Sequence, residues 1–385
     1  MTQDTDAKFF HVKRYQPMKF SITRENLLAP LQQVVSVIER KQTLPILANV
    51  LLRLEDDRLF LTGTDLELQL VTRTTVESGE PGQITLPARK LLDICRLLPD
   101  KSTVKLSLRG ERAELSCSAS RFNLTTLPAD NYPQFDSGSV DIEFQVAAHL
   151  LKKALDKTMF AMAVQDHRYF LNGLLLELDG RDLKTVASDG HRLCYFREAL
   201  NQETSHESRP IIIPRKGITE LYRLLGDSTD ELTLRISANT VQAELGHFNF
   251  SAKLVEGRFP DYQRVIPRDI VHTLLAERAA LKSALTRVSV LSNEKHKGLS
   301  LEVVDSETLL LEAQNPEHEQ AEEKVAIEAS GGNMKVGFNF TYLLDAINNI
   351  DSERVRLSFP AGCNSCMIED TEDSRFVFIV MPMRL

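Results

Sequence analysis

The feature that most constrains this 385-residue chain is a threefold internal repeat. A helix-like block leading into a strand-like run occurs at 87–108, at 214–236 and at 339–359. In each copy apolar residues recur at helical spacing, and a cluster of Gly, Pro, Asp or Ser follows. After this cluster, apolar and polar residues alternate with the period of two that is typical of a strand. The copies start 127 and then 125 residues apart. A repeat of this length indicates triplicated domains, because solenoids have much shorter units.

Each copy also has a second predicted helix, over 24–38, 147–162 and 277–291. Strand-like segments separate the two helices, and the first of them carries a hairpin signal at Asp56-Asp57. The pattern predicts an α+β fold of three similar domains, each with two helices and antiparallel sheets. We expect an N-terminal tail and three domains with the following bounds: 1–17, 18–141, 142–271 and 272–385.

Composition narrows the class of protein. Hydrophobic residues make up 42% and charged residues 26%, as in ordinary globular domains. No stretch approaches 18 consecutive apolar residues, so an ordinary membrane-spanning helix is not expected. Residues 1–17 lack the apolar core of an export signal, so we expect a tail there. Five Cys in so long a chain do not form a disulfide framework, which favours the reducing cytoplasm.

Positive charge is concentrated in the predicted helices. The net charge is −8, yet six helical blocks (24–41, 87–98, 147–162, 214–225, 277–291 and 339–350) hold fifteen Lys or Arg and only seven Asp or Glu. If these helices share one side, an acidic protein gains a basic inner face suited to a phosphate backbone read without sequence preference. The alternative is that Lys and Arg simply serve as helix formers on solvated faces.

Motifs for catalysis are missing. The sequence has no phosphate-binding Gly-rich loop, no His-Glu-x-x-His and no Gly-x-Ser-x-Gly. Cys363 and Cys366 have the spacing of a zinc or redox pair but stand alone, and ordinary strand-turn cysteines are favoured. Ser188-Asp-Gly-His191 contains the letters of a triad, yet Asp-Gly indicates a hairpin. We expect no catalytic residue, no metal site and no cofactor.

Two carboxylate groupings leave an enzymatic alternative open. Residues 315–323 could be drawn as a metal site, although a solvated edge or a charged interface is favoured. Asp65 and Glu67, two apart on a predicted strand, would share a face and could act as an acid–base pair. Two rival functions stay open. One is a metal-dependent hydrolase that uses these carboxylates, and the other is a protein-only scaffold that does not bind DNA.

Seven short stretches, in the same order along the chain, make the sequence from Met18 to Leu385 resemble the bacterial beta sliding clamp of DNA polymerase III. The stretches are Thr-Leu-Pro-Ile-Leu (43–47), Pro-Ala-Arg-Lys (87–90), Arg-Tyr-Phe-Leu-Asn-Gly (168–173), Ser-Asp-Gly-His-Arg-Leu (188–193), Gly-Arg-Phe-Pro-Asp-Tyr (257–262), Ser-Asn-Glu-Lys (292–295) and Met-Pro-Met-Arg-Leu (381–385). The resemblance implies a processivity factor without catalysis that encircles duplex DNA and tethers replicative and repair polymerases.

The resemblance also implies a head-to-tail homodimer that closes into a ring lined by helices, with a clamp loader, polymerases and repair proteins as partners. A closed heterologous contact needs two different, complementary patches on each chain. One implied patch is apolar and basic, and it consists of Lys90, Arg121, Phe122 and Leu124. The other is apolar and acidic, and it consists of Val290, Leu291, Glu317, Glu319, Glu322 and Glu323.

A pocket for short linear peptides is implied between the second and third domains. Apolar walls would receive Leu and Phe anchors, and a few polar groups would fix the orientation of the peptide. Its implied residues are Leu171, Ser188, Gly190, His191, Arg192, Leu193, Pro260, Val265, Asn339, Tyr342, Cys363, Ser365, Val380, Met381, Pro382 and Met383.

Contacts with duplex DNA are implied for seven residues, namely Lys41, Arg89, Gln165, Tyr169, Phe170, Arg215 and Lys216. The chain departs from the family pattern in three places. Lys41 stands where relatives can carry Arg. An ammonium group with a single point charge therefore replaces a guanidinium that can donate two parallel hydrogen bonds. Cys363 replaces a small aliphatic residue, and 1–17 has no recognisable counterpart.

Overall fold

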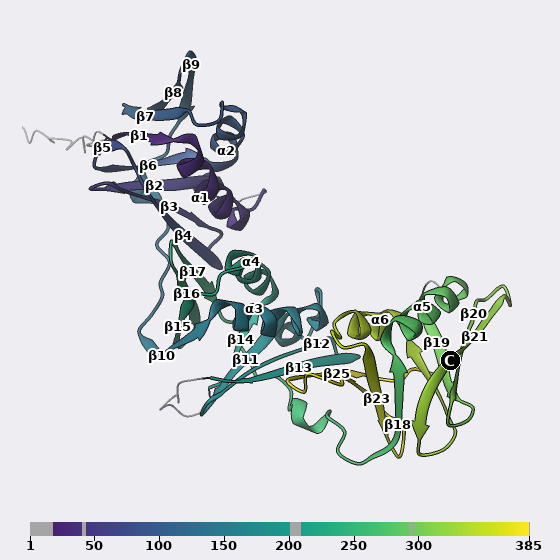
Figure 1. Cartoon of the computed structure of the whole chain (residues 1–385). Coiled ribbons are helices and arrows are strands. Elements are labelled where there is room, and N and C mark those ends of the chain that lie inside the picture. Colours follow the sequence, from purple (N-terminus) through teal and green to yellow (C-terminus); the bar gives the residue numbers. More distant parts are fainter. Residues whose placement is uncertain (1–17, 41–43, 201–208, 293–294, 296, 385) are drawn as a thin grey trace, which may run out of the picture. The chain divides into compact units, whose positions relative to one another are not determined.

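The computed structural model describes residues 18–40, 44–200, 209–292, 295 and 297–384. They form two compact units, each described by itself: residues up to 136 with 244–251, and 137–243 with residues from 252 onward. Figure 1 shows the ribbon of both units. Apart from 244–251, the second unit contains the segments expected as the second and third domains, and the domain boundaries given above stay a prediction. The expected tail, 1–17, and Lys41 lie outside the described residues.

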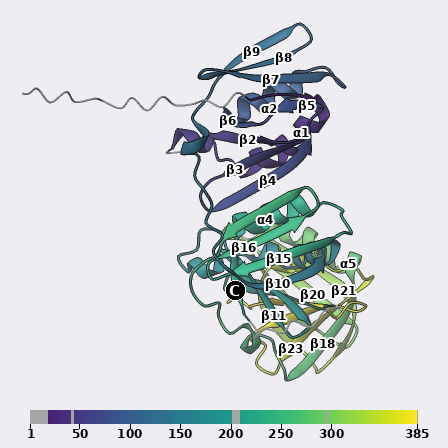
Figure 2. The same ribbon diagram turned by 90° about the vertical axis from the view of Figure 1, so that its left-hand side faces the viewer.

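The first unit contains two sets of antiparallel strands. One is a five-stranded sheet in the order β5 (Ser78–Glu80), β1 (Lys19–Thr23), β7 (Thr103–Arg109), β8 (Arg112–Cys117) and β9 (Ser120–Thr125). Figure 2 shows β9 at the outer margin of this sheet. The other set pairs β6 (Gly82–Pro87), β2 (Asn49–Glu55), β3 (Arg58–Thr64) and β4 (Leu68–Thr75) in that order. The hairpin predicted at Asp56-Asp57 joins β2 to β3, so that prediction is confirmed.

The second unit is built around one long antiparallel sheet. Its strand order is β14 (Ile211–Pro214), β11 (Gly173–Asp179), β12 (Asp182–Ser188), β13 (Arg192–Ala199), β25 (Phe376–Val380), β24 (Cys366–Asp370), β23 (Arg354–Pro360), β18 (Ile270–Glu277), β21 (Gln320–Ser330), β20 (Thr308–Gln314), β19 (Gly298–Val303) and β22 (Met334–Asn339). Three more strands pair with one another in the order β10 (Val140–Ala147), β15 (Glu231–Ser237) and β16 (Thr240–Leu245). The strand β17 is Phe248–Lys253.

Among the described residues, six α-helices lie where the repeat predicts them: α1 (Arg24–Val37), α2 (Ala88–Leu97), α3 (Ala148–Asp156), α4 (Arg215–Leu225), α5 (Arg278–Val288) and α6 (Phe340–Asn348). Two of them, α1 and α6, begin at a side-chain cap. The Thr23 hydroxyl accepts a hydrogen bond from the Asn26 N–H at 3.4 Å, and the Asn339 side chain accepts one from the Thr341 N–H at 3.0 Å. Among the described helices, none has the length and apolarity that a membrane crossing needs.

One helix ends earlier than predicted. The pattern extended the helix from 147 to 162, but α3 stops at Asp156 and a short 3-10 turn, η3 (Met159–Ala161), follows. The Thr158 hydroxyl donates to the Ala154 carbonyl oxygen at 2.6 Å, and β-branched residues that bond back in this way favour a helix end. Apolar spacing alone therefore overestimated the helix.

Close packing at β11 leads to a stability prediction. A Cβ atom on Gly173 would lie 2.6 Å from the carbonyl oxygen of Ile213 and 2.9 Å from a methyl carbon of Ile212. Gly173→Ala therefore forces β11 away from β14, and we expect a cost of about 1–3 kcal/mol. Thermal unfolding should show a midpoint lower by at least about 2 °C. Gly362→Ala is the control, because a Cβ there meets no atom within 4 Å, and equal midpoints for both variants would contradict the packing argument.

Candidate functional site

One pair of strands joins the two halves of the second unit, and we call this pair of strands the joint. β13 and β25 are antiparallel, with Arg192 opposite Val380 and Phe196 opposite Phe376. Beyond the last pair, the Met381 N–H donates to the His191 carbonyl oxygen at 2.8 Å. The Met383 N–H then donates to the Gly337 carbonyl oxygen of β22, also at 2.8 Å. The segment 380–383 is thereby held by hydrogen bonds at both of its ends.

An apolar cluster beside this joint reaches the molecular surface. Its buried members are Ala163, Leu171, Leu175, Val186, Leu193, Ile212, Phe259, Tyr262 and Ile379. Its half-buried members are Phe170, Tyr195, Val255, Val265, Ile266, Val377 and Met381. Four predicted pocket residues, Leu171, Leu193, Val265 and Met381, therefore lie together although they are far apart in sequence. The half-buried side chains offer an apolar surface that a ligand can cover.

Arg192 is the polar centre of the joint. Its guanidinium donates to the Asp189 carboxylate at 3.0 Å and to the Phe160 carbonyl oxygen at 2.9 Å, and it also pairs with Asp345 of α6. It lies 4.6 Å from the centroid of the Tyr342 ring, within cation–π range. Burial disfavours the charged form, but the Asp345 and Asp189 carboxylates outweigh it, so the pKa of Arg192 lies above its ordinary value.

His191 and Tyr342 face each other across the same joint. Their rings are nearly parallel, with an interplanar angle of 16° and centroids 6.4 Å apart. His191 is exposed and Tyr342 is half-buried. The structure thus brings the predicted residues Arg192, His191 and Tyr342 together, with one aromatic ring contributed by α6.

The hairpin between β12 and β13 supports this polar group. Its Asp-Gly turn confirms the hairpin prediction, because the Asp189 carboxylate accepts hydrogen bonds from the N–H groups of His191 and Arg192 at 2.9 and 3.0 Å. The φ angle of Gly190 is +87°, and a Cβ there would lie 2.7 Å from the Arg168 guanidinium. Only glycine fits both constraints. No triad forms among these residues, because the Asp189 carboxylate pairs with the Arg192 guanidinium and its hydrogen bond from His191 comes from the backbone N–H.

The remaining predicted pocket residues occupy the edges of this region. Pro260 is exposed, Ser188, Ser365 and Val380 are buried, and Cys363 and Pro382 are half-buried. Asn339 is used as the N-cap of α6. Burial raises the pKa of the Cys363 thiol, which disfavours a reactive thiolate. All five cysteines are free, and no cluster of three or more metal-ligating side chains occurs among the described residues.

Sequence reasoning missed Asp345 and Asp189, which orient Arg192. A signal for Asp345 was present, because it is the one acid in the block 339–350 and makes that block the only one with net negative charge. It could not be used from sequence alone, because its partner Arg192 lies 153 residues away.

A cavity lies at the start of α4. It has a volume of about 530 Å³ and brings together three of the predicted DNA contacts, Gln165, Arg215 and Lys216. The Arg215 guanidinium donates to the Met162 carbonyl oxygen at 2.8 Å, which fixes its direction. Tyr169 is 58% exposed, whereas Phe170 packs against the apolar cluster. In the first unit the exposed Arg89 donates to the Ile38 carbonyl oxygen.

Among the described helices, the first turns of five carry no acidic residue. Helices α2 to α6 lack Asp or Glu there, and α2 and α4 place two basic residues each in this position. Cations at a helix N-terminus oppose the helix dipole and do not help helix stability. The arrangement is suited to an external anion, which both the backbone N–H groups and the side chains can bind.

Several helical cations, however, already have partners within the chain. Lys153 and Lys157 lie in the helical block 147–162, for which the charge pattern predicts a basic surface, but the structure contradicts that prediction for these two residues. Lys157 is only 4% exposed and donates to Asp351 at 2.9 Å. Lys153 donates to Asp373 at 2.8 Å. These two side chains hold parts of the second unit together and are not free to form a phosphate surface.

Asp373 belongs to a chain of ion pairs across the joint. The Arg375 guanidinium donates to it at 2.7 and 2.8 Å and also pairs with Glu198 of β13 at 2.5 Å. Hydrogen bonds from Arg375, then from Lys153, hold the pKa of Asp373 well below its ordinary value. The joint is therefore fastened by charge as well as by strand pairing.

The two predicted subunit patches lie on different units. Phe122 and Leu124 are on β9, an edge strand that pairs only with β8 among the described strands. Lys90 and Arg121 are exposed. The basic patch therefore adjoins an open strand edge.

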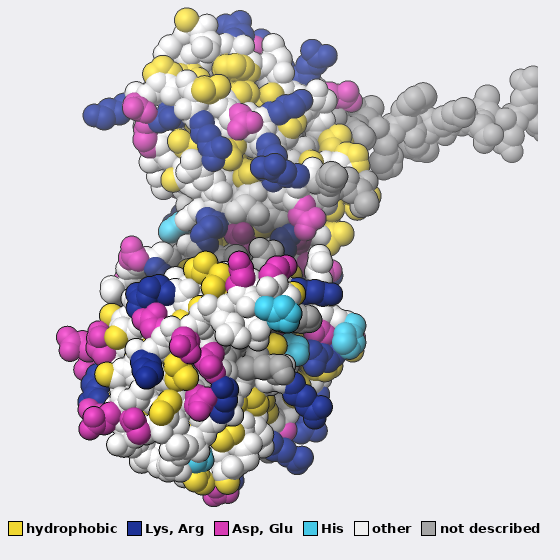
Figure 3. All heavy atoms as spheres, turned by 90° about the vertical axis from the view of Figure 1, so that its right-hand side faces the viewer, with side chains coloured by type: hydrophobic (Ala, Val, Ile, Leu, Met, Phe, Trp, Pro, Cys, Tyr) yellow, Lys and Arg dark blue, Asp and Glu magenta, His cyan; other side chains and the backbone are white. Residues whose placement is uncertain are grey.

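The acidic patch adjoins an open edge as well. β21 pairs with β20 through residues 320–326 and with β18 only through 327–330, so among the described residues its N-terminal half has one unpaired edge. Val290, in the turn η6 (Ser289–Leu291), is 77% exposed, and Leu291 is half-buried. Figure 3 shows Asp and Glu side chains on this face. Glu317, Glu319 and Glu322 are exposed, whereas Glu323 pairs with Arg287.

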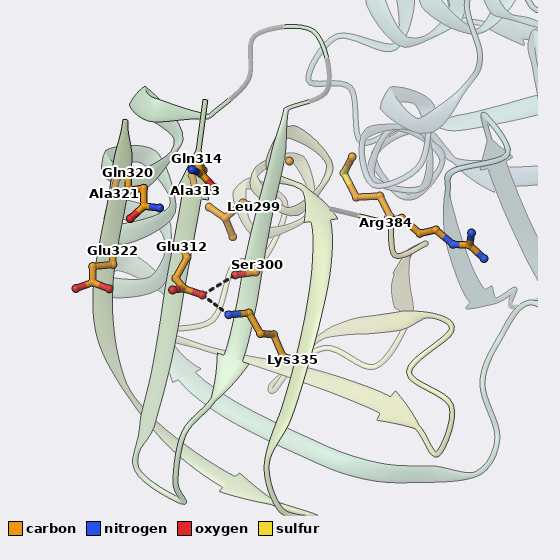
Figure 4. A pocket seen from close by; sticks show the side chains of 12 residues that line it. Leu299, Ser300, Glu312, Ala313, Gln314, Gln320, Ala321, Glu322, Lys335 and Arg384 are labelled. Carbon is orange, nitrogen blue, oxygen red and sulfur yellow. Dashed lines mark hydrogen bonds and ion pairs between the residues drawn. The ribbon is translucent and has the colours of Figure 1, made fainter. Parts of the chain in front are cut away.

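A cavity of about 830 Å³ covers the polar face of β19–β22. Figure 4 shows Glu312 linked to Ser300 and Lys335 there. The hydrogen bond from Lys335 lowers the pKa of Glu312. Met383 lines this cavity, and so does Glu322 of the acidic patch. The cavity thus lies between the C-terminal segment and the open edge of β21.

The carboxylate pair Asp65 and Glu67 is not the acid–base pair that a shared strand face would allow. Both residues lie in the turn after β3, and the Asp65 carboxylate accepts hydrogen bonds from the N–H groups of Glu67 and Leu68 at 2.9 and 2.6 Å. The strand assignment was wrong because a side-chain turn at Asp competes with the ladder.

Comparison with known proteins identifies the class. The chain shares its fold with the DNA polymerase sliding clamp of Pseudomonas aeruginosa, at 44% identity and a TM-score of 0.92 over 96% of this chain and all of that one. The Caulobacter crescentus sliding clamp matches at 34% identity and a TM-score of 0.90, again over 96% of this chain and all of that one. A Pseudomonas aeruginosa clamp bound to griselimycin matches with a TM-score of 0.93. The protein is thus a DNA sliding clamp.

The sequence comparisons specify the family. The chain matches the family models of the DNA polymerase III beta subunit for all three of its domains. The N-terminal domain matches at 18–136, the central domain at 145–261 and the C-terminal domain at 263–384. The beta sliding clamps of Pseudomonas aeruginosa and of Escherichia coli K12 are each 44% identical over 96% of this chain and their whole length. The chain belongs to the DNA polymerase III beta subunit family.

The ion pairs at the joint predict a pH dependence. Because the folded-state pKa of Asp373 is depressed, its contribution to stability is present above the ordinary pKa of Asp, about 4, and is lost as the pH falls below it. Asp373→Asn should lower the thermal midpoint at pH 7 by about 2–4 °C. The gap between wild type and variant should shrink as the pH falls from 5 to about 3. A gap that stays constant or widens in acid would contradict this assignment.

Proposed function

We propose that two copies of this chain close head to tail into a ring around duplex DNA. The observation that carries the proposal is the pair of open strand edges, β9 on one unit and the N-terminal half of β21 on the other. Each edge adjoins an apolar residue of the predicted interface, Phe122 in one case and Val290 in the other. Two different patches of this kind generate a ring when the rotation between subunits closes.

Charge supports the same pairing. The β9 patch carries the exposed cations Lys90 and Arg121, and the β21 patch carries exposed carboxylates such as Glu317 and Glu322. Opposite charges at the rim of an interface favour the correct partner and orientation more than they raise affinity. We assign the role of an interface to all ten predicted residues, with Glu323 acting there in its pair with Arg287.

For DNA, we propose weak contacts with phosphates through the cations at helix N-termini. Arg215, Lys216 and Gln165 share one cavity, and Arg89 has a similar place in α2. We add Tyr169, which is exposed, and retain Lys41 and Phe170 as predicted contacts. A closed ring cannot leave DNA sideways, so these contacts can stay weak and permit sliding.

For protein partners, we propose that the apolar cluster and the Arg192 group bind short peptides from polymerases, from a clamp loader and from repair proteins. Leu and Phe side chains of a peptide would cover the half-buried members of the cluster, and the His191–Tyr342 pair would border the polar part of the peptide. A related clamp binds griselimycin, which makes that compound a suitable probe.

We further propose that the protein has no catalytic activity of its own and acts in the cytoplasm. The Asp65–Glu67 carboxylate pair, which left a hydrolase open as an alternative, is used in a turn, and burial disfavours the thiolate form of Cys363 in the peptide region. A separate ATP-driven loader would then open the ring. DNA turnover that requires a metal ion and is abolished by Asp65→Ala would overturn this part of the proposal.

The ring predicts a molecular mass in solution of twice the 43.4 kDa of one chain. Val290→Asp should yield the mass of a single chain at low micromolar concentration, because a buried unpaired carboxylate is costly in an apolar contact. Light scattering after gel filtration measures both. Val304→Asp, at another exposed apolar position, is the control and should stay dimeric. A wild-type protein that is a single chain throughout would exclude the ring.

Topological binding predicts retention on closed DNA. After loading by a clamp loader with ATP, the protein should stay on circular DNA and leave once the DNA is cut, whereas a scaffold would bind neither form. Lys216→Gln should reduce the slope of log affinity against log salt by about 0.9, as expected for one lost phosphate contact. Arg235→Gln, which removes a charge paired with Glu143, should leave the slope unchanged. Equal escape from circular and linear DNA would overturn the proposal.

A further inference from the structure

Helix α3 and its C-cap residue, Lys157, carry three lysines that have different partners. Lys152 donates to Asp227 at 2.9 Å, and both residues lie within 137–243. Lys153 and Lys157 instead reach across to residues near β25 and α6. A solvated helix face would leave all three charges equivalent, so the difference calls for a specific role.

Of Lys153 and Lys157, Lys157 is the more deeply buried. Its ammonium group donates to the Asn349 carbonyl oxygen at the end of α6 and to Asp351, and it lies 4.6 Å from the centroid of the Phe376 ring. A cation at a helix C-terminus is favoured by the helix dipole. The buried stem and the aromatic contact leave no part of this side chain available to DNA.

Lys153 contacts the turn before the same strand. Its partner Asp373 lies in the turn that leads into β25, and that carboxylate is also held by Arg375, which pairs with Glu198 of β13. Both lysines therefore fasten α3 to the beginning of β25, one through Phe376 itself and one through the turn before it.

The other end of β25 enters the proposed peptide pocket. The strand has five residues, about 17 Å in length, and the chain passes directly from Val380 to Met381. Any shift of β25 along β13 would move Met381 away from the apolar cluster, because successive side chains alternate between faces. The position of the pocket wall thus depends on how firmly the far end of β25 is held.

We propose that Lys153 and Lys157 are positioning residues of the peptide pocket, which fix β25 against β13, and that they are not DNA contacts. The proposal rests on the peptide-binding function given above. The two ammonium groups raise the population of the state in which the pocket wall is complete. A ligand that binds only this state loses apparent affinity in proportion to the fraction that is competent.

The test measures griselimycin binding by surface plasmon resonance with the full-length protein immobilised. Lys157→Met and Lys153→Met retain the apolar stem and remove the charge. Each should lower the association rate and raise Kd by about 3- to 10-fold, with an unchanged dissociation rate, because only the competent fraction falls. Lys152→Met removes the same charge from the same helix and should change Kd by less than about 1.5-fold.

A conservative variant separates positioning from general destabilisation. Lys153→Arg keeps a donor for Asp373 and should restore binding to within about 2-fold of wild type. Lys153 lies at the surface, so its variants should fold even if Lys157→Met does not. Wild-type kinetics in a folded Lys153→Met protein would overturn the proposal, and so would equal losses in Lys152→Met. Failure of the wild-type protein to bind griselimycin would instead overturn the pocket assignment itself.

Discussion

The hydrogen-bonded pairing of β13 with β25 is the constraint on which the candidate site depends. Five residue pairs place a strand near residue 192 against one near residue 380. Closing such a long loop costs conformational entropy, and the cost is offset by the ladder, the apolar cluster and the ion pairs that flank it. The ladder places His191 and Arg192, at the start of β13, directly beside Met381, which follows the end of β25, and α6 lies next to this end of the ladder.

Helix positions could be predicted from the sequence, because the relevant signals are local. Pro87, Pro214 and Asn339 each mark a helix start, and the structure places α2, α4 and α6 directly after them. Local signals failed where a polar side chain competed for the backbone. Thr158 ends α3 early, and Asp65 makes a turn where alternation suggested a strand. The errors were thus of one physical kind.

The site could be predicted only in part. Motif resemblance named Arg192, His191 and Tyr342, and the structure brings them together. Resemblance did not supply Asp345, since an ion pair between residues 153 positions apart is set by strand register, which no local pattern encodes. Counting charge was misleading for the same reason: it treated Lys157 and Lys216 alike, although one is buried against Phe376 and the other lines an open cavity.

The two open strand edges have a consequence for a chain without its partner. An unpaired edge presents a row of N–H and C=O groups that can template the addition of foreign strands. Natural proteins guard such edges with charge, and β9 and β21 carry Arg121 and Glu322 near theirs. In the proposed head-to-tail dimer, these charges would protect newly synthesised chains against aggregation before they pair, and would let the interface part again without irreversible association.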